Sequence, residues 1–413
     1  MRNKILSNYL STILLLSGVV VGGLLGVFLG PKAAVLRPIG EIFLNLIFVL
    51  VVPLVFLSVA QSMIVLRRNN MVGKVLGTAI VVFLCMSTLA ALASYLGLMA
   101  WNPFTELGGI GLVEKTEVAG SSSGIWESLP GAVTVGDFPL LLSKSNLLPL
   151  IVFSALFGVA VSMLGEKGSL VAKFIEECSL VIMKIMELVM KIAPLGIGCY
   201  FADVIGNLGG QIVGSYLDIF LVVLVVSLVF YFGVNTVYAL IAGVPLGVFW
   251  REMIAPSVTA IGTCSSAACM PVSIKAASNM GVDPRIAEGV IPLGTNLHKD
   301  GSIITSVGKI LFAMTFFGMY SPGIGTLAMV VGIALIQSVV VGAIPIGGMT
   351  GEILICSILG VDPSFAATIL IIGTICDIPA TLLNSTMNLS GAMLVDRFCY
   401  GRSLSGRETH GMQ

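Results

Sequence analysis

The chain consists mainly of long apolar runs that are separated by short polar intervals. A helix that spans a membrane needs about 20 mostly apolar residues. Runs of this length predict helices near residues 8–30, 38–65, 75–101, 143–165, 170–208 and 211–243. The long polar stretch over 102–142 contains several acids and few bases, which is typical of an external loop. No polar interval is long enough to bury a core of its own, so the pattern predicts an all-α polytopic membrane protein without a soluble domain.

The second half of the chain departs from plain spans. Clusters of polar residues, glycine and proline interrupt its apolar sequence at residues 263–273, 294–302, 342–349 and 376–391. Unpaired backbone groups in lipid cost several kcal/mol each, so such breaks persist only inside protein or along an aqueous cavity. In transporters, interrupted helices of this kind form the solute and ion site. The four clusters therefore predict a binding site for a small solute at membrane depth.

Composition supports this interpretation and narrows the function. Hydrophobic residues make up 57% of the 413 residues and charged residues only 10%, against roughly a quarter charged in soluble domains. The 21 basic and 21 acidic residues balance, so no nucleic-acid partner is indicated. The eight cysteines have no metal-site spacing, and no HExxH or nucleophile-elbow motif occurs. We therefore expect neither an enzyme nor a cofactor.

Basic residues indicate how the chain is oriented in the membrane. They gather at the N-terminus, in alternate loops and in the tail, at Arg2, Lys4, Arg67, Arg68, Lys74, Lys167, Lys173, Arg251, Arg402 and Arg407. By the positive-inside tendency, both termini are cytoplasmic and the protein lies in the inner (plasma) membrane. Lys32 and Arg37 weaken the asymmetry at the first external loop. The first apolar segment is too long for a signal-peptide core, so we expect it to remain as a membrane helix.

The motifs at the interruptions resemble those of the dicarboxylate/amino acid:cation symporter family, which includes the glutamate transporters. TCSSAACMPVS at 263–273 resembles the family's serine-rich tip followed by LPVT, and GTNLHKDGS at 294–302 resembles its GATINMDGT break. GAIPIGGM at 342–349 resembles the tip of its second hairpin, and STMNLSG at 385–391 resembles its TMVNVTG. The motifs keep the family's order and spacing over nearly the whole chain.

This resemblance implies a glutamate-transporter-like elevator fold with eight transmembrane helices and two re-entrant helical hairpins, assembled as a homotrimer. Scaffold helices 1 and 2 would lie in 1–74, and helices 4 and 5 in 143–208, with an external loop at 102–142 and a cytoplasmic tail at 403–413. The moving transport domain would comprise helix 3 at 75–101 and residues 209–402. Within 209–402, the elements after helix 6 are hairpin 1 at about 247–280, helix 7 at 284–317, hairpin 2 at 323–360 and helix 8 at 363–402.

Asp300 is the first candidate for an ion ligand, because an ionisable residue inside a span is costly and usually functional. It matches the family aspartate that helps hold a sodium ion; a structural hydrogen-bonding role is the alternative. Ser87 and Thr88 align with a hydroxyl pair that completes this site, and Ser338 with a residue near a sodium. The ion-binding residues that the resemblance implies are Ser87, Thr88, Gly294, His298, Lys299, Asp300, Ser338 and Asn388.

Several residues depart from the family pattern. His298 stands where the family has asparagine, and Lys299 where it has methionine. Lys299 either replaces a bound cation with its own ammonium group or pairs elsewhere. Ala392 replaces a sodium-binding aspartate. We therefore expect fewer coupled sodium ions than in typical relatives, or proton coupling through His298 and Asp300.

The solute site is implied in the same way. Ser265 and Ser266 offer donors beside an expected helix end, which suits a carboxylate; close packing of small residues is the alternative. Thr381 and Asn384 replace the acid and the arginine that would hold an acidic amino acid. The implied substrate residues are Ser265, Ser266, Pro345, Gly347, Asp377, Asn384, Ser385 and Asn388.

The resulting prediction is a secondary active symporter for a small carboxylate-bearing solute, an amino acid or a dicarboxylate, coupled to a sodium or proton gradient. The alternative is a passive anion channel or a non-transporting sensor that retains the fold.

Overall fold

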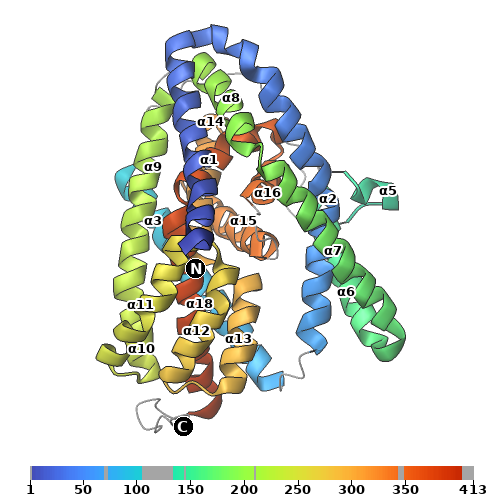
Figure 1. The fold of residues 1–413 in the computed structure, drawn as a ribbon, viewed down its shortest axis with the longest axis vertical. Coiled ribbons are helices and arrows are strands. Elements are labelled where there is room, and N and C mark those ends of the chain that lie inside the picture. The colour runs from blue at the N-terminus through green and yellow to red at the C-terminus, as the bar shows by residue number, and fades with distance from the viewer. Residues whose placement is uncertain are drawn as a thin grey trace.

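The computed structural model describes residues 2–68, 73–104, 134–143, 146–208, 211–342 and 348–401, and this part of the chain contains helices and no strands (Figure 1). The helices before hairpin 1 are α1 (Arg2–Leu29), η1 (Gly30–Leu36), α2 (Arg37–Arg68), α3 (Gly73–Trp101), α5 (Phe138–Leu141), α6 (Leu147–Met163), η3 (Gly165–Gly168), α7 (Ser169–Met190), α8 (Ala193–Leu208), α9 (Gln211–Leu228), η4 (Val229–Val234) and α10 (Asn235–Ala242). The later ones are α11 (Leu246–Thr263), α12 (Ser266–Asn279), α13 (Pro284–Leu297), α14 (Asp300–Phe316), α15 (Ile324–Gly342), α16 (Gly348–Leu359), η5 (Pro363–Phe365), α17 (Ala366–Ile375) and α18 (Asp377–Tyr400).

The run predicted as one helix over 170–208 is two helices, and this prediction was wrong. α7 ends at Met190, and α8 begins at Ala193. The charged residues of α7 lie exposed on an amphipathic helix, at Lys173, Glu176, Glu177, Lys184 and Glu187. A search for apolar runs merged this helix with the apolar α8 because its buried face is apolar as well. The predicted helix over 211–243 is continuous but contains a π-helical turn, η4.

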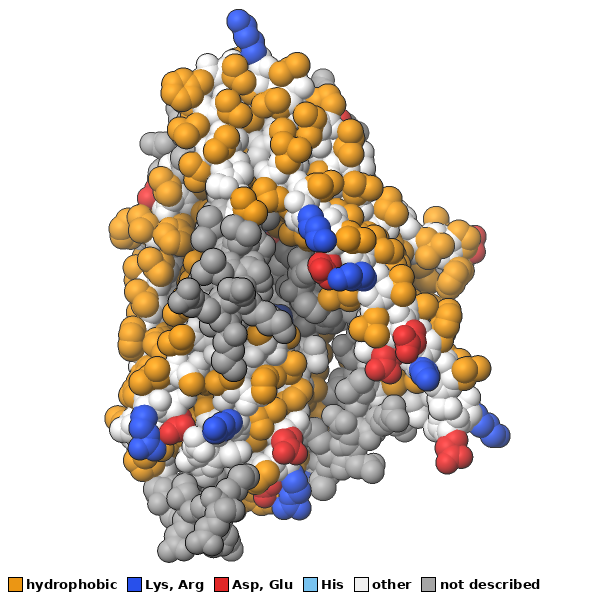
Figure 2. All heavy atoms as spheres, in the orientation of Figure 1, with side chains coloured by type: hydrophobic (Ala, Val, Ile, Leu, Met, Phe, Trp, Pro, Cys, Tyr) orange, Lys and Arg blue, Asp and Glu red, His pale blue; other side chains and the backbone are white. Residues whose placement is uncertain are grey.

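The surface supports a membrane location. In the described part of the chain, three helical stretches are long and apolar enough to cross a membrane, Ser17–Gln61, Gly73–Trp101 and Gly214–Ala242. The pair Pro363–Ile375 and Asp377–Tyr400, bent by 68°, makes a fourth if it is counted as one span. Figure 2 shows hydrophobic side chains over most of the upper part and the left flank, with charged side chains toward the lower end and along α6 and α7. An apolar belt of this kind is the surface that lipid requires.

Three of the four predicted interruptions lie in the described residues, and the one at 376–391 begins at the bend between α17 and α18. α11 and α12 are antiparallel, because Asn279 at the end of α12 donates to Glu252 near the start of α11 (Nδ2–Oε2, 2.7 Å). The chain reverses at Cys264, which has a φ of 45°. α13 and α14 are separated by His298, whose backbone is extended, and by Lys299, whose backbone is also non-helical. The expected tip of the second hairpin lies between α15 and α16, and its candidate residues Pro345 and Gly347 lie outside the described residues.

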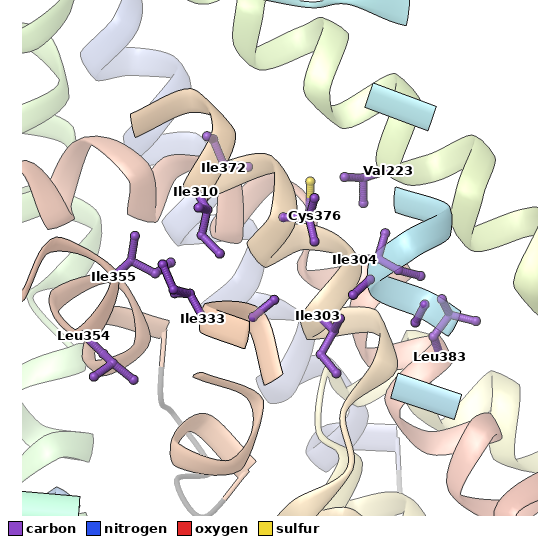
Figure 3. Packing of buried hydrophobic residues seen from close by; sticks show 14 of the residues in the cluster. Val223, Ile303, Ile304, Ile310, Ile333, Leu354, Ile355, Ile372, Cys376 and Leu383 are labelled. Carbon is purple, nitrogen blue, oxygen red and sulfur yellow. The ribbon is translucent and has the colours of Figure 1, made fainter. Parts of the chain in front are cut away.

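α14 is the central helix of the second half, and almost all of its residues are buried. Figure 3 shows its Ile310 gathered with Ile333 of α15, Ile355 of α16 and Ile372 of α17. At Gly301, a Cβ atom would lie 2.1 Å from the carbonyl oxygen of Ala380. Only glycine permits this approach, which brings the start of α14 against α18 and so positions the side chains described next.

Glycines also join the first helix to α8. A Cβ atom at Gly22 would lie 2.1 Å from the carbonyl oxygen of Gly198, and one at Gly18 would lie 2.2 Å from that of Pro194. Small residues at intervals of four let two membrane helices approach at backbone distance. This packing places α1 directly against α8 (Figure 1).

Candidate solute and ion site

The Asp300 carboxylate occupies the first position of α14 and is fully buried. Its Oδ1 accepts a hydrogen bond from Ser87 Oγ of α3 (2.9 Å) and lies 2.9 Å from His298 Nε2. Its Oδ2 has no hydrogen-bond partner among the described residues. A buried carboxylate with an unused oxygen needs a positive charge close by, so this position suits a cation.

His298 is held on three sides between α13 and α14. Its Nδ1 lies 2.8 Å from Asn388 Oδ1 of α18, and its ring stacks on Phe83 of α3 with centroids 4.4 Å apart. Because an amide oxygen only accepts, Nδ1 donates this hydrogen bond and Nε2 is directed at Asp300. The imidazole therefore stands against the carboxylate, where the relatives' motif has an asparagine.

Two glycines provide the room for this arrangement. A Cβ atom at Gly294 would lie 2.5 Å from Asn388 Oδ1, and one at Gly391 would lie 2.6 Å from the Phe83 ring. Gly294, which the sequence places in the ion-binding set, thus contributes space beside the ion candidates.

Lys299 turns away from Asp300, although the two residues are adjacent in the chain. Its Nζ donates to Ser266 Oγ (3.3 Å), at the first residue of α12. Ser265 caps the same helix, and its hydroxyl accepts from the backbone N–H of Ala268 (3.3 Å). The structure thus brings Lys299, Ser265 and Ser266 together at the tip of the α11–α12 hairpin.

The side-chain amide of Asn384 of α18 is used for hydrogen bonds to another residue of the protein. Its Nδ2 donates to Ser302 Oγ (3.0 Å), and its Oδ1 accepts from the backbone N–H of Ser302 (3.1 Å). Ser385 Oγ and Asn388 Nδ2 are buried and have no hydrogen-bond partner within the described ranges. Asp377 Oδ1 accepts a long hydrogen bond from Thr381 (3.5 Å). Of the α18 candidates, Ser385 and Asn388 therefore keep unused polar groups for a ligand.

Two predicted ion ligands are not joined to Asp300. The Thr88 hydroxyl donates to the carbonyl oxygen of Leu84 in its own helix (2.7 Å). Ser338 is buried on α15, and its hydroxyl has no hydrogen-bond partner in the described part of the chain. Of the expected hydroxyl pair on α3, only Ser87 contacts the carboxylate.

The sequence analysis missed a polar stripe on α14. Ser306 donates to Gln337 Oε1 of α15, and Lys309 forms a buried ion pair with Glu352 of α16. A Cβ atom at Gly373 would lie 2.7 Å from Lys309 Nζ, so α17 closes over this pair. The presence of ionisable residues inside apolar runs could have indicated that Lys309 and Glu352 are buried. Their pairing could not be predicted, because the two residues are 43 positions apart and meet only in the tertiary fold.

Comparison with known proteins decides the family. The model of the sodium:dicarboxylate symporter family matches residues 12–398, which is almost the entire chain. The chain belongs to the sodium:dicarboxylate symporter family. This membership confirms the resemblance seen in the motifs.

The relatives of this chain bear names from two solute classes. A C4-dicarboxylate transport protein of Albidiferax ferrireducens is 29% identical over 303 residues, which cover 69% of this chain and 65% of that protein. A proton/sodium-glutamate symport protein of Geobacillus stearothermophilus is 26% identical, covering 93% of this chain and 92% of that protein. A protein of the same name from Bacillus subtilis is 27% identical, with coverage of 92% and 91%. The family and these relatives are transporters, not enzymes.

Proposed function

We propose that this protein is a secondary active symporter that takes up a small carboxylate-bearing solute, an amino acid or a dicarboxylate, together with sodium or protons. The observation that carries the proposal is the buried Asp300 carboxylate at the break between α13 and α14. Charge at such a depth is costly unless it is compensated, and an exchangeable cation provides the compensation. Because the same break carries Lys299 to the tip of α12, a solute there would lie close to the cation.

The residues around Asp300 support coupling to fewer sodium ions than in typical relatives. The imidazole of His298 stands 2.9 Å from the carboxylate, and Ser87 supplies a hydroxyl. Ala392, where the family pattern has a further aspartate, is buried and offers no oxygen ligand. One carboxylate for sodium is therefore absent, and the remaining one already faces a group that can carry a proton.

We further propose that transport follows an elevator mechanism in a homotrimer of the inner membrane, with cytoplasmic termini. α3 and residues 209–402 would move against 1–74 and 143–208. Side-chain contacts support the grouping of α3 with the later helices: Ser94 donates to the carbonyl oxygen of Ile304 (2.8 Å), and Lys74 donates to that of Cys399 (3.0 Å). These contacts bridge more than 200 residues of sequence.

The test is uptake of radiolabelled succinate and glutamate into proteoliposomes that contain the purified protein. Sodium and proton gradients are imposed separately, and protein-free vesicles are the control. We expect at least one gradient to raise the uptake of at least one solute. Uptake that is indifferent to both gradients would contradict coupling. Ionic current without solute accumulation would indicate the channel alternative, which the names of the relatives do not favour.

A further inference from the structure

The Lys299 ammonium group is buried without an acidic partner. The side chain is 7% exposed, and its Nζ donates to one described acceptor, the Ser266 hydroxyl. No carboxylate of the described residues forms an ion pair with it. Asp377 acts on it electrostatically but from beyond ion-pair distance. Lys309, also a buried lysine of this region, forms an ion pair with Glu352. A buried ammonium without an anion is costly, which points to a ligand of negative charge.

The group beside Lys299 is also an anion-binding element. Ser266 is the first residue of α12, a helix of 14 residues. The first amide N–H groups of a helix have no acceptor within it, and the helix dipole makes this end positive. The Ser265 hydroxyl takes one of these N–H groups, that of Ala268. An ammonium group placed against a positive helix end is unfavourable unless an anion binds both.

The residues around Lys299 provide few hydrogen-bond acceptors for the amino group of an amino acid. Thr381 stands where the family pattern has the acid that binds this group. The Asn384 amide is already bonded through both of its polar atoms to Ser302. The ammonium group of a zwitterionic amino acid would also be repelled by Lys299. Asp377 is a carboxylate that acts on Lys299 electrostatically, and its Oδ1 already accepts a hydrogen bond from Thr381.

We propose that Lys299, at the tip of the α11–α12 hairpin, pairs with the carboxylate of the solute and selects acids without an amino group over α-amino acids. The inference rests on the proposed symport function and narrows its solute class. It differs from the sequence-based alternative that Lys299 substitutes for a coupled cation, and it is favoured by the contact of the ammonium group with the hairpin tip.

The test measures binding to the full chain purified in detergent, by calorimetry and by stabilisation against heat. The probes are succinate against aspartate and propionate against alanine; the members of each pair share a skeleton and differ by the amino group. We expect at least one amino-free acid to bind more tightly than its partner. Lys299→Met should weaken that acid about tenfold to a hundredfold, the range of a lost hydrogen bond to a charged group. Lys299→Arg should bind it more tightly than Lys299→Met does.

Lys275→Met is the matched control, because Lys275 is exposed on the same helix α12. It should bind as the unaltered protein does. Without ligand, Lys299→Met should melt at or above the temperature of the unaltered protein, because an uncompensated buried charge has been removed. A lysine with a purely structural role would give a lower melting temperature and unchanged affinity.

Three results would overturn the inference: equal affinity of Lys299→Met and the unaltered protein, tighter binding of the amino acid in both pairs, or no binding of either amino-free acid. The binding assay needs no gradient, so its outcome is separate from that of the coupling experiment. Uptake that ignores both gradients would end the symport proposal, even if the acid binds through Lys299.

Discussion

Asp300 and Lys299 are neighbours in the chain, yet their side chains point to opposite sides of the break between α13 and α14. Consecutive residues of a regular helix do not face each other, and the non-helical backbone at His298 and Lys299 adds to this separation. The carboxylate turns toward Ser87 and His298, while the ammonium group turns toward Ser266. The break therefore separates a position for a cation from a position for an anion.

His298→Asn tests the role of the imidazole at the residue scale. The family pattern has asparagine here, and an amide cannot carry a positive charge toward Asp300. We expect the variant to depend more strongly on sodium, so that the ratio of uptake with and without a sodium gradient rises several-fold. His410→Asn, in the tail outside the described residues, is the control. An unchanged ratio in His298→Asn would show that the imidazole does not take the place of a cation.

At the scale of elements, α14 is joined to both α15 and α16 by polar groups. Ser306 bonds to α15 and Lys309 to α16, and both lie on the α14 face that begins with Ser302. Because α14 also carries Asp300, movement of α15 or α16 would displace the Asp300 carboxylate. The buried ion pair is the strongest of these links.

Removing one member of the Lys309–Glu352 pair should be strongly destabilising. Lys309→Met and Glu352→Gln each leave an unmatched polar group in the core, at a cost of about 3–5 kcal/mol. Lys309→Met combined with Glu352→Leu should recover most of this loss. Thermal unfolding of the purified variants in detergent measures the effect. The exposed pair of Lys184 and Glu187 is the control, where loss should stay within about 1 kcal/mol. Equal effects at the two pairs would refute a structural role for the buried one.

The contact between α1 and α8 makes a second prediction at this scale. In Gly22→Ala the added Cβ would meet the carbonyl oxygen of Gly198 at 2.1 Å, so the helices must separate. We expect a loss of about 1–3 kcal/mol, as for other overpacked sites. Gly77→Ala in α3, where no atom lies within 4 Å, should leave stability unchanged or slightly higher. Melting temperatures that fall equally in both variants would argue against close packing at Gly22.

At the scale of the whole molecule, sequence reasoning located the helix breaks but not the contacts between helices. The breaks near Cys264 and His298 were predictable because polar residues and unpaired backbone groups are costly in lipid, so they mark places where a helix is interrupted inside the protein. The direction of Lys299 and the use of Asn384 by Ser302 were not, since both depend on how α12, α14 and α18 approach one another. The hydrogen bond from Thr88 to its own turn was not predictable either, because a hydroxyl in a helix can donate locally or to a neighbouring helix. The boundary between α7 and α8 was hidden because both helices are apolar on their buried sides.

The account as a whole depends on Asp300 as the site where cation and solute movements are coupled. The most direct test compares accumulation in proteoliposomes of the unaltered protein, Asp300→Asn, and Asp137→Asn, whose side chain is exposed outside the site. With the effective cation gradient directed inward, the unaltered protein and Asp137→Asn should concentrate the solute above its external level. Asp300→Asn should at most equilibrate it, because the amide leaves no charge for the cation. Accumulation by Asp300→Asn equal to that of the unaltered protein would contradict the account.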